Sequence, residues 1–458
     1  MRNLLQKCFK WQWLVCLAVG CCFSSCKDDE ESTSGYDPNK LVELADFYPT
    51  TGRLSTQVIL NGSNFGNNTE NVKVFFNDKE AAIISVKDNK MLVLAPRRAS
   101  IVENPKCIIK VQVGDQIKQY DKLFDYYIQT NVTTLVGGST SSKTNPVKTV
   151  PLSEAQFMAN LERSICVDAN KNIYFLVDND GKYAAYMLNE EADQLKCLAE
   201  DLSATMNSPV LGYDPQSGSV YQFYSQKGSM EYKYFNPQKD YELTDVGKIK
   251  MDKDVSDYNT PAWFGVWFMK WVFTMGPDNM LYSRFTGGAV VRYNLKTGQG
   301  ENLTLENQAV GTKDGNTYGL VFDPKDSNIF YFSNNDKHCI YKYNLLTREY
   351  SVWAGQEGQS GYLDGPITEA RFNKPGQMCV DSEGNIIFCD TENHCIRKIT
   401  MSTGYVSTIA GIPQKSGWID GTSENAMFKK PIGLCIDADD VMYVGDSENR
   451  AIRRVAVE

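Results

Sequence analysis

Short apolar runs, rich in β-branched and aromatic residues, alternate with clusters of Gly, Asn, Asp and Pro along most of the chain. Runs of this length, bounded by turn-forming residues, predict β-strands rather than helices. In the first part of the chain they lie at residues 57–60, 72–76, 91–95, 107–113 and 123–128. Several short strands in close succession favour two packed sheets, so we predict a small β-sandwich over residues 40–128.

The second part of the chain repeats itself. Residues 372–399 align without a gap on residues 428–455, and the offset of 56 positions (428 minus 372) carries Asp390 onto Asp446. Earlier copies are degenerate, but each has an Asp at the turn after its first strand, namely Asp168, Asp214, Asp278 and Asp323. Six such units fill residues 131–458, and radial repetition of four-stranded units predicts a six-bladed β-propeller.

The last repeat stops one strand short of the repeat before it. Residues 132–137, Val-Thr-Thr-Leu-Val-Gly, are similar to the fourth strand of the preceding unit at residues 406–411. We predict that this early segment pairs with the last unit and closes the ring, which removes an exposed sheet edge. The two domains are then joined by residues 129–131.

The first 26 residues have the organisation of an export signal. A basic start is followed by the apolar run 11–23 and then by Ser24-Ser25-Cys26. This ending resembles a bacterial lipobox, which implies removal of residues 1–25 and lipidation of Cys26. Residues 26–39 form an acidic tether that resembles the export signal of Bacteroidetes surface lipoproteins. The implied location is the outer membrane, with the lipid-anchored protein facing the cell exterior; an ordinary cleaved signal is the alternative.

Composition narrows the possible functions. The chain carries 47 basic and 56 acidic side chains, a net charge of −9, which disfavours broad nucleic-acid binding. Only two residues are histidines, and no CxxC pair follows Cys26, so zinc-ribbon and thioredoxin-like chemistry lack support. Eight cysteines lie beyond Cys26, and we expect them to serve as small apolar core residues.

Two sets of motifs resemble known families. Val58, Leu60, Gly62 and the run Asn64-Phe65-Gly66 resemble the IPT/TIG immunoglobulin-like family, whose domains usually act as spacers or contact modules. The repeat, with its F-x-x-P, D-x-x-G-N and N-[HR]-x-I-R elements, resembles the NHL repeat family. The implied fold class is all-β, with an N-terminal Ig-like (IPT/TIG) sandwich followed by a six-bladed NHL-type β-propeller over residues 131–458.

Candidate catalytic residues are few. His338 and His394 occupy one repeat position in adjacent units, so we interpret them as structural rather than as metal ligands. The turn aspartates should accept hydrogen bonds within their own loops. The run Asp178-Asn179-Asp180-Gly181 lacks the glutamate of a calcium loop and is predicted to be a plain turn. We therefore predict no catalytic residue, no metal site and no cofactor.

One aromatic segment, residues 261–271, interrupts the repeat and contains three of the seven tryptophans. Trp263 and Trp267 are the candidate glycan-binding residues, because flat aromatic faces stack on sugar rings. The alternative is that these rings fill the core between blades. Tyr362 and Trp418 share a repeat position and are predicted to be part of the common repeat structure.

Together, the signal, the acidic tether and the two domains resemble a Sus-like surface glycan-binding protein. This resemblance implies a non-catalytic lipoprotein for polysaccharide utilization, which captures a polysaccharide or oligosaccharide beside Sus-type outer-membrane transporter components. The propeller is then the recognition head, and the Ig-like domain is the spacer. Two alternatives stay open: a propeller polysaccharide lyase or lactonase, and a protein-protein interaction scaffold.

Overall fold

The computed structural model describes residues 35–96, 106–138, 148–179, 182–202, 207–226, 229–251, 272–284, 290–303 and 316–457. The chain divides into two compact units, one ending at Tyr127 and one beginning at Ile128. The predicted signal and Cys26 lie outside the described residues. Within the described ranges, no helix has both the length and the apolar character needed to cross a membrane.

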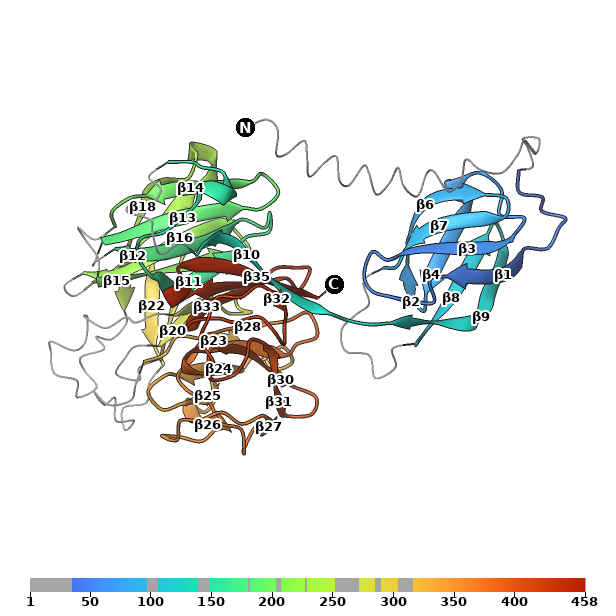
Figure 1. Cartoon of the computed structure of the whole chain (residues 1–458). Helices are drawn as coiled ribbons and strands as arrows, with labels where there is room; N and C mark the ends of the chain where they lie inside the picture. Colours follow the sequence, from blue (N-terminus) through green and yellow to red (C-terminus); the bar gives the residue numbers. More distant parts are fainter. Residues whose placement is uncertain are drawn as a thin grey trace. The chain divides into compact units, whose positions relative to one another are not determined.

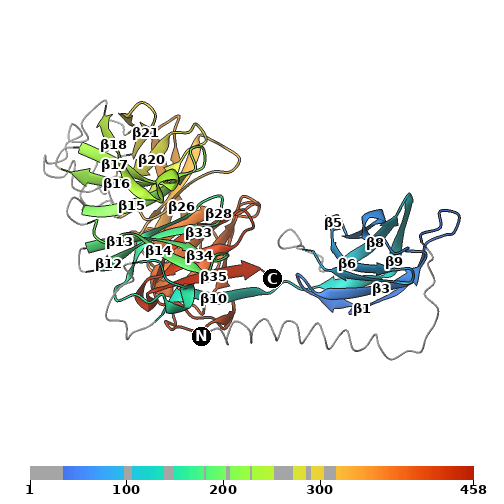
Figure 2. The same ribbon diagram turned by 90° about the horizontal axis from the view of Figure 1, so that it is seen from above.

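The first unit is a sandwich of two sheets (Figures 1 and 2). One sheet has the strand order β1 (Glu43–Tyr48), β3 (Gln57–Ser63), β7 (Lys90–Leu94) and β6 (Ala82–Lys87). The other has the order β2 (Thr51–Gly52), β9 (Gln116–Tyr126), β8 (Lys106–Val113), β4 (Val72–Phe76) and β5 (Lys79–Glu80).

Alternation along the strands of this unit explains its core. Cys107, Ile109, Val111 and Val113 of β8 are fully buried, while the residues between them are only partly covered. A period of two buries one face of each sheet against the other. Asn64 is also buried, with φ of 63°, and its side-chain amide donates hydrogen bonds to the carbonyls of residues 37 and 40, at 2.9 and 2.8 Å.

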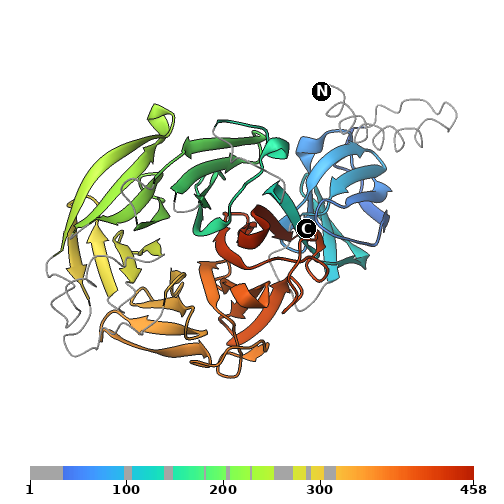
Figure 3. The same ribbon diagram turned by 60° about the vertical axis from the view of Figure 1, so that its left-hand side comes forward.

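The second unit contains six groups of four antiparallel strands among the described residues, which we call blades 1 to 6 (Figure 3). Blades 1 to 3 comprise β11 (Leu161–Val167), β12 (Ile173–Asn179), β13 (Lys182–Asn189), β14 (Gln194–Ala199); β15 (Asn207–Asp214), β16 (Ser219–Gln226), β17 (Ser229–Asn236), β18 (Glu242–Met251); and β19 (Phe273–Met275), β20 (Leu281–Arg284), β21 (Val290–Asn294), β22 (Gln299–Asn302). Blades 2 and 3 are joined into one sheet by a short parallel pairing of β18 with β22.

Blades 4 to 6 follow the same plan. They comprise β23 (Leu320–Phe322), β24 (Ile329–Asn334), β25 (Cys339–Asn344), β26 (Glu349–Gly355); β28 (Pro375–Val380), β29 (Ile386–Asp390), β30 (Cys395–Thr400), β31 (Tyr405–Ala410); and β33 (Pro431–Ile436), β34 (Met442–Asp446), β35 (Ala451–Val457), β10 (Thr130–Gly137). Two-residue strands, β27 (Gly365–Pro366) and β32 (Gly421–Thr422), pair with the outer strands β31 and β10. Among the described residues, 3-10 turns lie at η2 (Thr69–Asn71), η3 (Leu152–Glu154), η5 (Pro237–Lys239), η7 (Thr391–Asn393) and η8 (Ser447–Asn449).

The ring closes as the sequence predicts. The first strand of each blade contacts the first strand of the next, and β33 of blade 6 returns to contact β11 of blade 1. The outer strand of blade 6 is β10, which pairs antiparallel with β35 from Thr130 opposite Val457 to Gly137 opposite Ala451. An early strand therefore completes the last blade. The predicted fold class, an Ig-like sandwich followed by a β-propeller, is confirmed.

A buried ion network recurs in the last two blades. Arg397 donates to the carboxylate of Asp390 at 2.7 Å, and Asn393 donates to the same oxygen at 2.8 Å. Arg453 and Asp446 repeat this pair at 2.7 Å in blade 6, and all four charged side chains are fully buried. Because a buried charge is tolerated only when it is paired and hydrogen-bonded, these contacts explain why the residues recur 56 positions apart.

Candidate functional site

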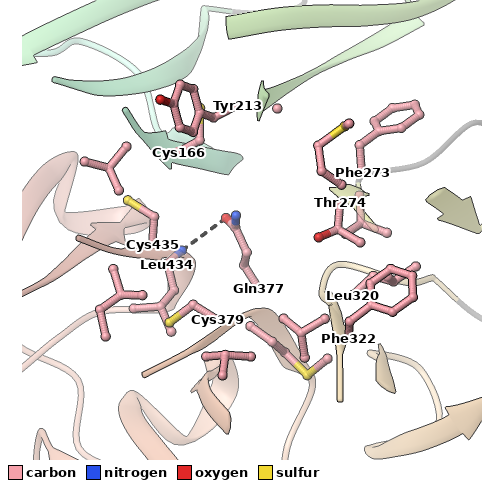
Figure 4. A pocket seen from close by; sticks show the side chains of 18 of the residues that line it. Cys166, Tyr213, Phe273, Thr274, Leu320, Phe322, Gln377, Cys379, Leu434 and Cys435 are labelled. Atoms are coloured by element: carbon pink, nitrogen blue, oxygen red, sulfur yellow. Dashed lines mark hydrogen bonds between the residues drawn. The ribbon is translucent and has the colours of Figure 1, made fainter. Parts of the chain in front are cut away.

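A cavity of about 700 Å³ lies on the axis of the propeller and is lined by the first strand of all six blades (Figure 4). The turns that follow these strands in blades 3 and 4 contribute Pro277, Asp323, Lys325 and Ser327. Ligand pockets usually occupy about 300–1,000 Å³ and combine apolar walls with a few polar groups. The cavity therefore has a size that suits a small molecule or the end of a longer chain.

Gln377 of β28 holds three blades together across this cavity. Its side-chain oxygen accepts hydrogen bonds from the backbone N–H groups of Ile165 and Leu434, at 3.2 and 3.1 Å. Its amide nitrogen donates to the carbonyl of Ile165 at 2.8 Å. The equivalent position 56 residues later is Gly433, which has no side chain. The wall formed by blades 5, 6 and 1 is therefore fixed by one residue that departs from the repeat (Figure 4).

The opposite wall of the cavity is aromatic, with Tyr213 from β15, Phe273 from β19 and Phe322 from β23 (Figure 4). Tyr213 and Phe322 immediately precede the turn aspartates of blades 2 and 4. In blades 1, 5 and 6 the same position holds the aliphatic residues Val167, Val380 and Ile436. The Tyr213 hydroxyl accepts a hydrogen bond from the backbone N–H of Ala169 at 3.2 Å, which fixes this ring against blade 1. Blades 2 to 4 thus carry aromatic rings at this wall, and two of them also pack within the propeller: Phe273 stacks on Phe223 at 4.2 Å, and Phe322 meets Tyr282 edge-on at 4.9 Å.

Three cysteine thiols, those of Cys166, Cys379 and Cys435, also line the cavity. The expectation that cysteines serve as core residues is confirmed for Cys435, but it is incomplete for Cys166 and Cys379, which are only partly covered because the channel runs past them. Burial raises the pKa of all three thiols, and neighbouring carboxylates such as Asp168 and Asp381 raise it further. At neutral pH these groups are protonated thiols, which are weak nucleophiles and weak metal ligands.

The turn aspartates are occupied by their own loops, as predicted. Asp323 accepts a hydrogen bond from the backbone N–H of Lys325 at 2.8 Å and another from the Tyr331 hydroxyl at 2.7 Å. Asp168 accepts in the same way from the Tyr174 hydroxyl at 3.0 Å. Within the described ranges, no three His, Cys, Asp or Glu side chains are grouped so that they could hold a metal ion.

Comparison with known families identifies two parts of the chain. Residues 43–126 match the IPT/TIG domain, and residues 372–399 match the NHL repeat. The chain contains an IPT/TIG domain and an NHL repeat. Both resemblances expected from the motifs are therefore confirmed, and the NHL match coincides with the first strands of blade 5.

Known proteins resemble the chain over different lengths. NHL repeat-containing protein 2 of Bos taurus is 26% identical over 162 residues, which is 32% of this chain and 22% of that protein. The match thus spans less than a quarter of the length of that relative. A structural genomics protein of unknown function from Bacteroides thetaiotaomicron is 24% identical, with a TM-score of 0.68 over 93% of this chain and 100% of that one. An auxiliary nutrient binding protein from Bacteroides ovatus is 22% identical, with a TM-score of 0.57 over 93% of this chain and 100% of that one.

The two histidines have equivalent roles in blades 4 and 5. His338 and His394 each have a φ of 58°, and each imidazole Nδ1 accepts a backbone hydrogen bond from the following blade. The donors are Lys374 at 3.1 Å and Lys430 at 3.2 Å. Burial lowers the pKa of both imidazoles, which favours the neutral form that accepts this bond. Both side chains connect successive blades, in agreement with the structural interpretation.

Tyr362 and Trp418 also have matching roles. The Tyr362 hydroxyl lies 2.9 Å from the Thr408 hydroxyl, and the Trp418 indole N–H donates to the Thr134 hydroxyl at 3.0 Å. Thr408 and Thr134 occupy the same position in the fourth strands of blades 5 and 6. Each aromatic residue thus contacts the outer strand of its own blade, 5 or 6, which confirms their place in the common repeat structure.

Trp263 and Trp267, the predicted glycan-binding residues, lie outside the described residues, so their role stays a prediction. Gln377, Tyr213 and Phe322 line the cavity but were not among the residues predicted from the sequence. A signal for them exists, because each is a large side chain where other repeats carry a small or aliphatic one.

Proposed function

We propose that this protein is a non-catalytic, lipid-anchored surface protein that binds a glycan nutrient in the axial cavity of its propeller. The observation that carries this proposal is the fold match to the auxiliary nutrient binding protein from Bacteroides ovatus, which extends over 93% of this chain and all of that one. A fold match over nearly the whole of both chains supports a shared type of task, while the ligand depends on the residues of the site.

The cavity supports sugar binding. Tyr213 and Phe322 provide aromatic rings on one wall, and the amide of Gln377 and the hydroxyl of Thr274 provide polar groups nearby. The apolar face of a sugar ring stacks on an aromatic ring, while its hydroxyls need hydrogen-bonding partners. Trp263 and Trp267 are proposed as additional contacts from the segment before β19.

The remaining parts of the proposal concern location and partners. Lipid on Cys26 and the acidic tether of residues 26–39 would hold the protein at the outer membrane, facing outward. The IPT/TIG domain would act as the spacer and the propeller as the head that delivers a polysaccharide or oligosaccharide to Sus-type transporter components. Replacing Cys26 by Ala is expected to move the protein from the membrane fraction to the soluble fraction.

Affinity electrophoresis tests the binding function. The purified protein is run through gels containing xylan, glucomannan, β-glucan, yeast mannan, polygalacturonate or chondroitin sulfate. We expect retardation by one of these glycans without release of new reducing or unsaturated ends. The Tyr213→Val/Phe322→Val variant introduces the aliphatic side chains of the other blades and is expected to lose this retardation.

Two further variants locate the site. Tyr405→Ala removes an exposed tyrosine from the outer strand β31 and should leave retardation unchanged. Trp263→Ala/Trp267→Ala should weaken retardation if the segment before β19 also contacts the glycan. Retardation that persists in the Tyr213→Val/Phe322→Val variant would refute the cavity as the site. Absence of retardation by every glycan would refute the binding function, and new chain ends would show an enzyme instead.

A further inference from the structure

A second hollow of about 320 Å³ lies between blade 1 and blade 6, where the ring closes. Blade 1 contributes turn residues, including Asn170, Asn189 and Glu190, and blade 6 contributes Tyr443 and Arg454. Unlike the axial cavity, this groove is lined almost wholly by polar and charged side chains. Its size is at the lower end of the range for ligand pockets, about 300 Å³.

Blade 6 departs from the repeat at the residues that form this groove. In blade 5, the buried Lys398 ammonium contacts the turn carboxylate of Asp381 at 2.8 Å. The equivalent of Lys398 in blade 6 is Arg454, and its Nε lies 3.7 Å from the carboxylate of Glu190 in blade 1. The basic side chain at this position therefore pairs within its own blade in blade 5, whereas in blade 6 it faces a carboxylate of the neighbouring blade 1.

Tyr443 fixes the turn of blade 6 at the groove, because its hydroxyl donates a hydrogen bond to the carboxylate of Asp437 at 3.2 Å. Tyrosines make the same contact with the turn aspartates of blades 1 and 4, and blade 5, with Ile387 at this position, is the exception. Burial, together with Asp437, raises the pKa of Tyr443, so its hydroxyl remains a donor. The groove wall is thus held in place by contacts that blade 5 does not make.

The groove and the axial cavity share two turns of the chain. Ile436 lines the cavity and the next residue, Asp437, lines the groove, while Val167 lines the cavity and Asn170 lines the groove. Both hollows therefore border the turns between the first and second strands of blades 1 and 6.

We propose that the groove between blades 1 and 6 is a subsite for a neutral sugar unit of the same glycan whose end occupies the axial cavity. This inference rests on the proposed function and specifies its substrate class. The Arg454 guanidinium and the Glu190 carboxylate present donors and acceptors side by side, an arrangement that matches the two hydroxyls of a vicinal diol. Asn170 and Asn189 add amide groups at the same groove.

The charges of the groove argue for a neutral ligand. Its lining contains two basic side chains, Lys171 and Arg454, and three acidic ones, Glu190, Glu191 and Asp437. Lys171 also pairs with Asp439 beside the groove. Since an anionic sugar would meet more negative than positive charge here, uronic acid and sulfated units are disfavoured.

Calorimetric titration with oligosaccharides of increasing length tests the subsite. The series is prepared from the polysaccharide of the panel that retards the wild-type protein. Glu190→Gln keeps the shape of an exposed side chain and removes its charge, and Arg454→Gln removes the partner. We expect either change to weaken binding of the longer oligosaccharides about tenfold, the loss typical of one hydrogen bond to a charged group, and to leave the shortest member unaffected.

Glu357→Gln is the matched control, because Glu357 pairs with Lys337 at 2.7 Å on blade 4 and is exposed to a degree similar to Glu190. Unchanged affinity in Glu190→Gln and Arg454→Gln, with affinity lost in Tyr213→Val/Phe322→Val, would overturn the subsite and leave the proposed function intact. Binding of polygalacturonate or chondroitin sulfate alone would overturn the neutral class. No binding by the wild-type protein would overturn both proposals.

Discussion

Gly137 provides a direct test of how the propeller closes. This residue ends β10, has a φ of +87°, and an added Cβ would lie 1.9 Å from the carbonyl oxygen of Arg450 in blade 6. Gly355 ends the fourth strand of blade 4 and Gly411 directly follows that of blade 5, with φ of +83° and +92°. The three glycines thus occupy the same place in their blades, although Gly137 precedes the others by more than 200 residues.

The cost of Gly137→Ala has two parts. An alanine at positive φ costs about 1–2 kcal/mol, offset by about 0.4–1 kcal/mol because glycine makes the unfolded chain more flexible. The clash with Arg450 also forces β10 away, which breaks the hydrogen bond of Gly137 to Ala155 at 2.9 Å and that of Gly138 to Arg450 at 3.2 Å. Two hydrogen bonds are worth about 1–3 kcal/mol.

Gly404→Ala is the control that separates the backbone strain from the clash with Arg450. Gly404 has a φ of +63° in the turn between β30 and β31, and a Cβ there would meet only Ile367, at 3.9 Å. This change carries the backbone strain without the clash. We therefore expect Gly137→Ala to lower the free energy of unfolding by about 1–3 kcal/mol more than Gly404→Ala does.

Urea unfolding followed by tryptophan fluorescence measures this difference. Beyond the predicted signal, the tryptophans all lie between residues 263 and 418, so their emission follows the propeller rather than the IPT/TIG domain. Equal unfolding midpoints for the two variants would refute the closure of blade 6 by β10. A lower unfolding midpoint for Gly137→Ala than for Gly404→Ala would support this closure.

Two further predictions concern side chains that obey the repeat. Asp446→Asn should lower the free energy of unfolding by about 3 kcal/mol, since it removes the buried partner of Arg453 and leaves only the partly exposed Asp420 carboxylate, at 2.7 Å, to balance the charge. Arg453→Met/Asp446→Leu should restore much of this loss in urea titrations; a single variant as stable as the wild type would contradict this. Because folding lowers the pKa of His338 and His394 below the ordinary 6.5, stability should be lost as the pH falls below about 6.5. His338→Asn/His394→Asn should reduce the drop in Tm between pH 7.5 and pH 5, and an identical drop in both proteins would contradict the assignment.

Much of the fold was predictable because it depends on local patterns. Alternating residues and turn signals are sufficient to identify the sandwich, and the repeat identifies the blades. The closing strand was predictable because residues 132–137 copy residues 406–411 so well. The axial cavity was not, since it depends on which side chains converge from six strands that are far apart in sequence. Periodicity gives the place of Gln377 in its own strand but not its contacts with Ile165 and Leu434.

Repeats divide the residues of a propeller into those that follow the common pattern and those that depart from it. Residues such as Arg453 or His394 make the same contacts in adjacent blades, so their recurrence is explained by the structure of a blade. Gln377 requires a different explanation, because its side chain reaches Leu434, next to the glycine at its own repeat position in blade 6. The wall formed by blades 5, 6 and 1 therefore combines residues that follow the repeat, Cys379 and Cys435, with one that departs from it, Gln377.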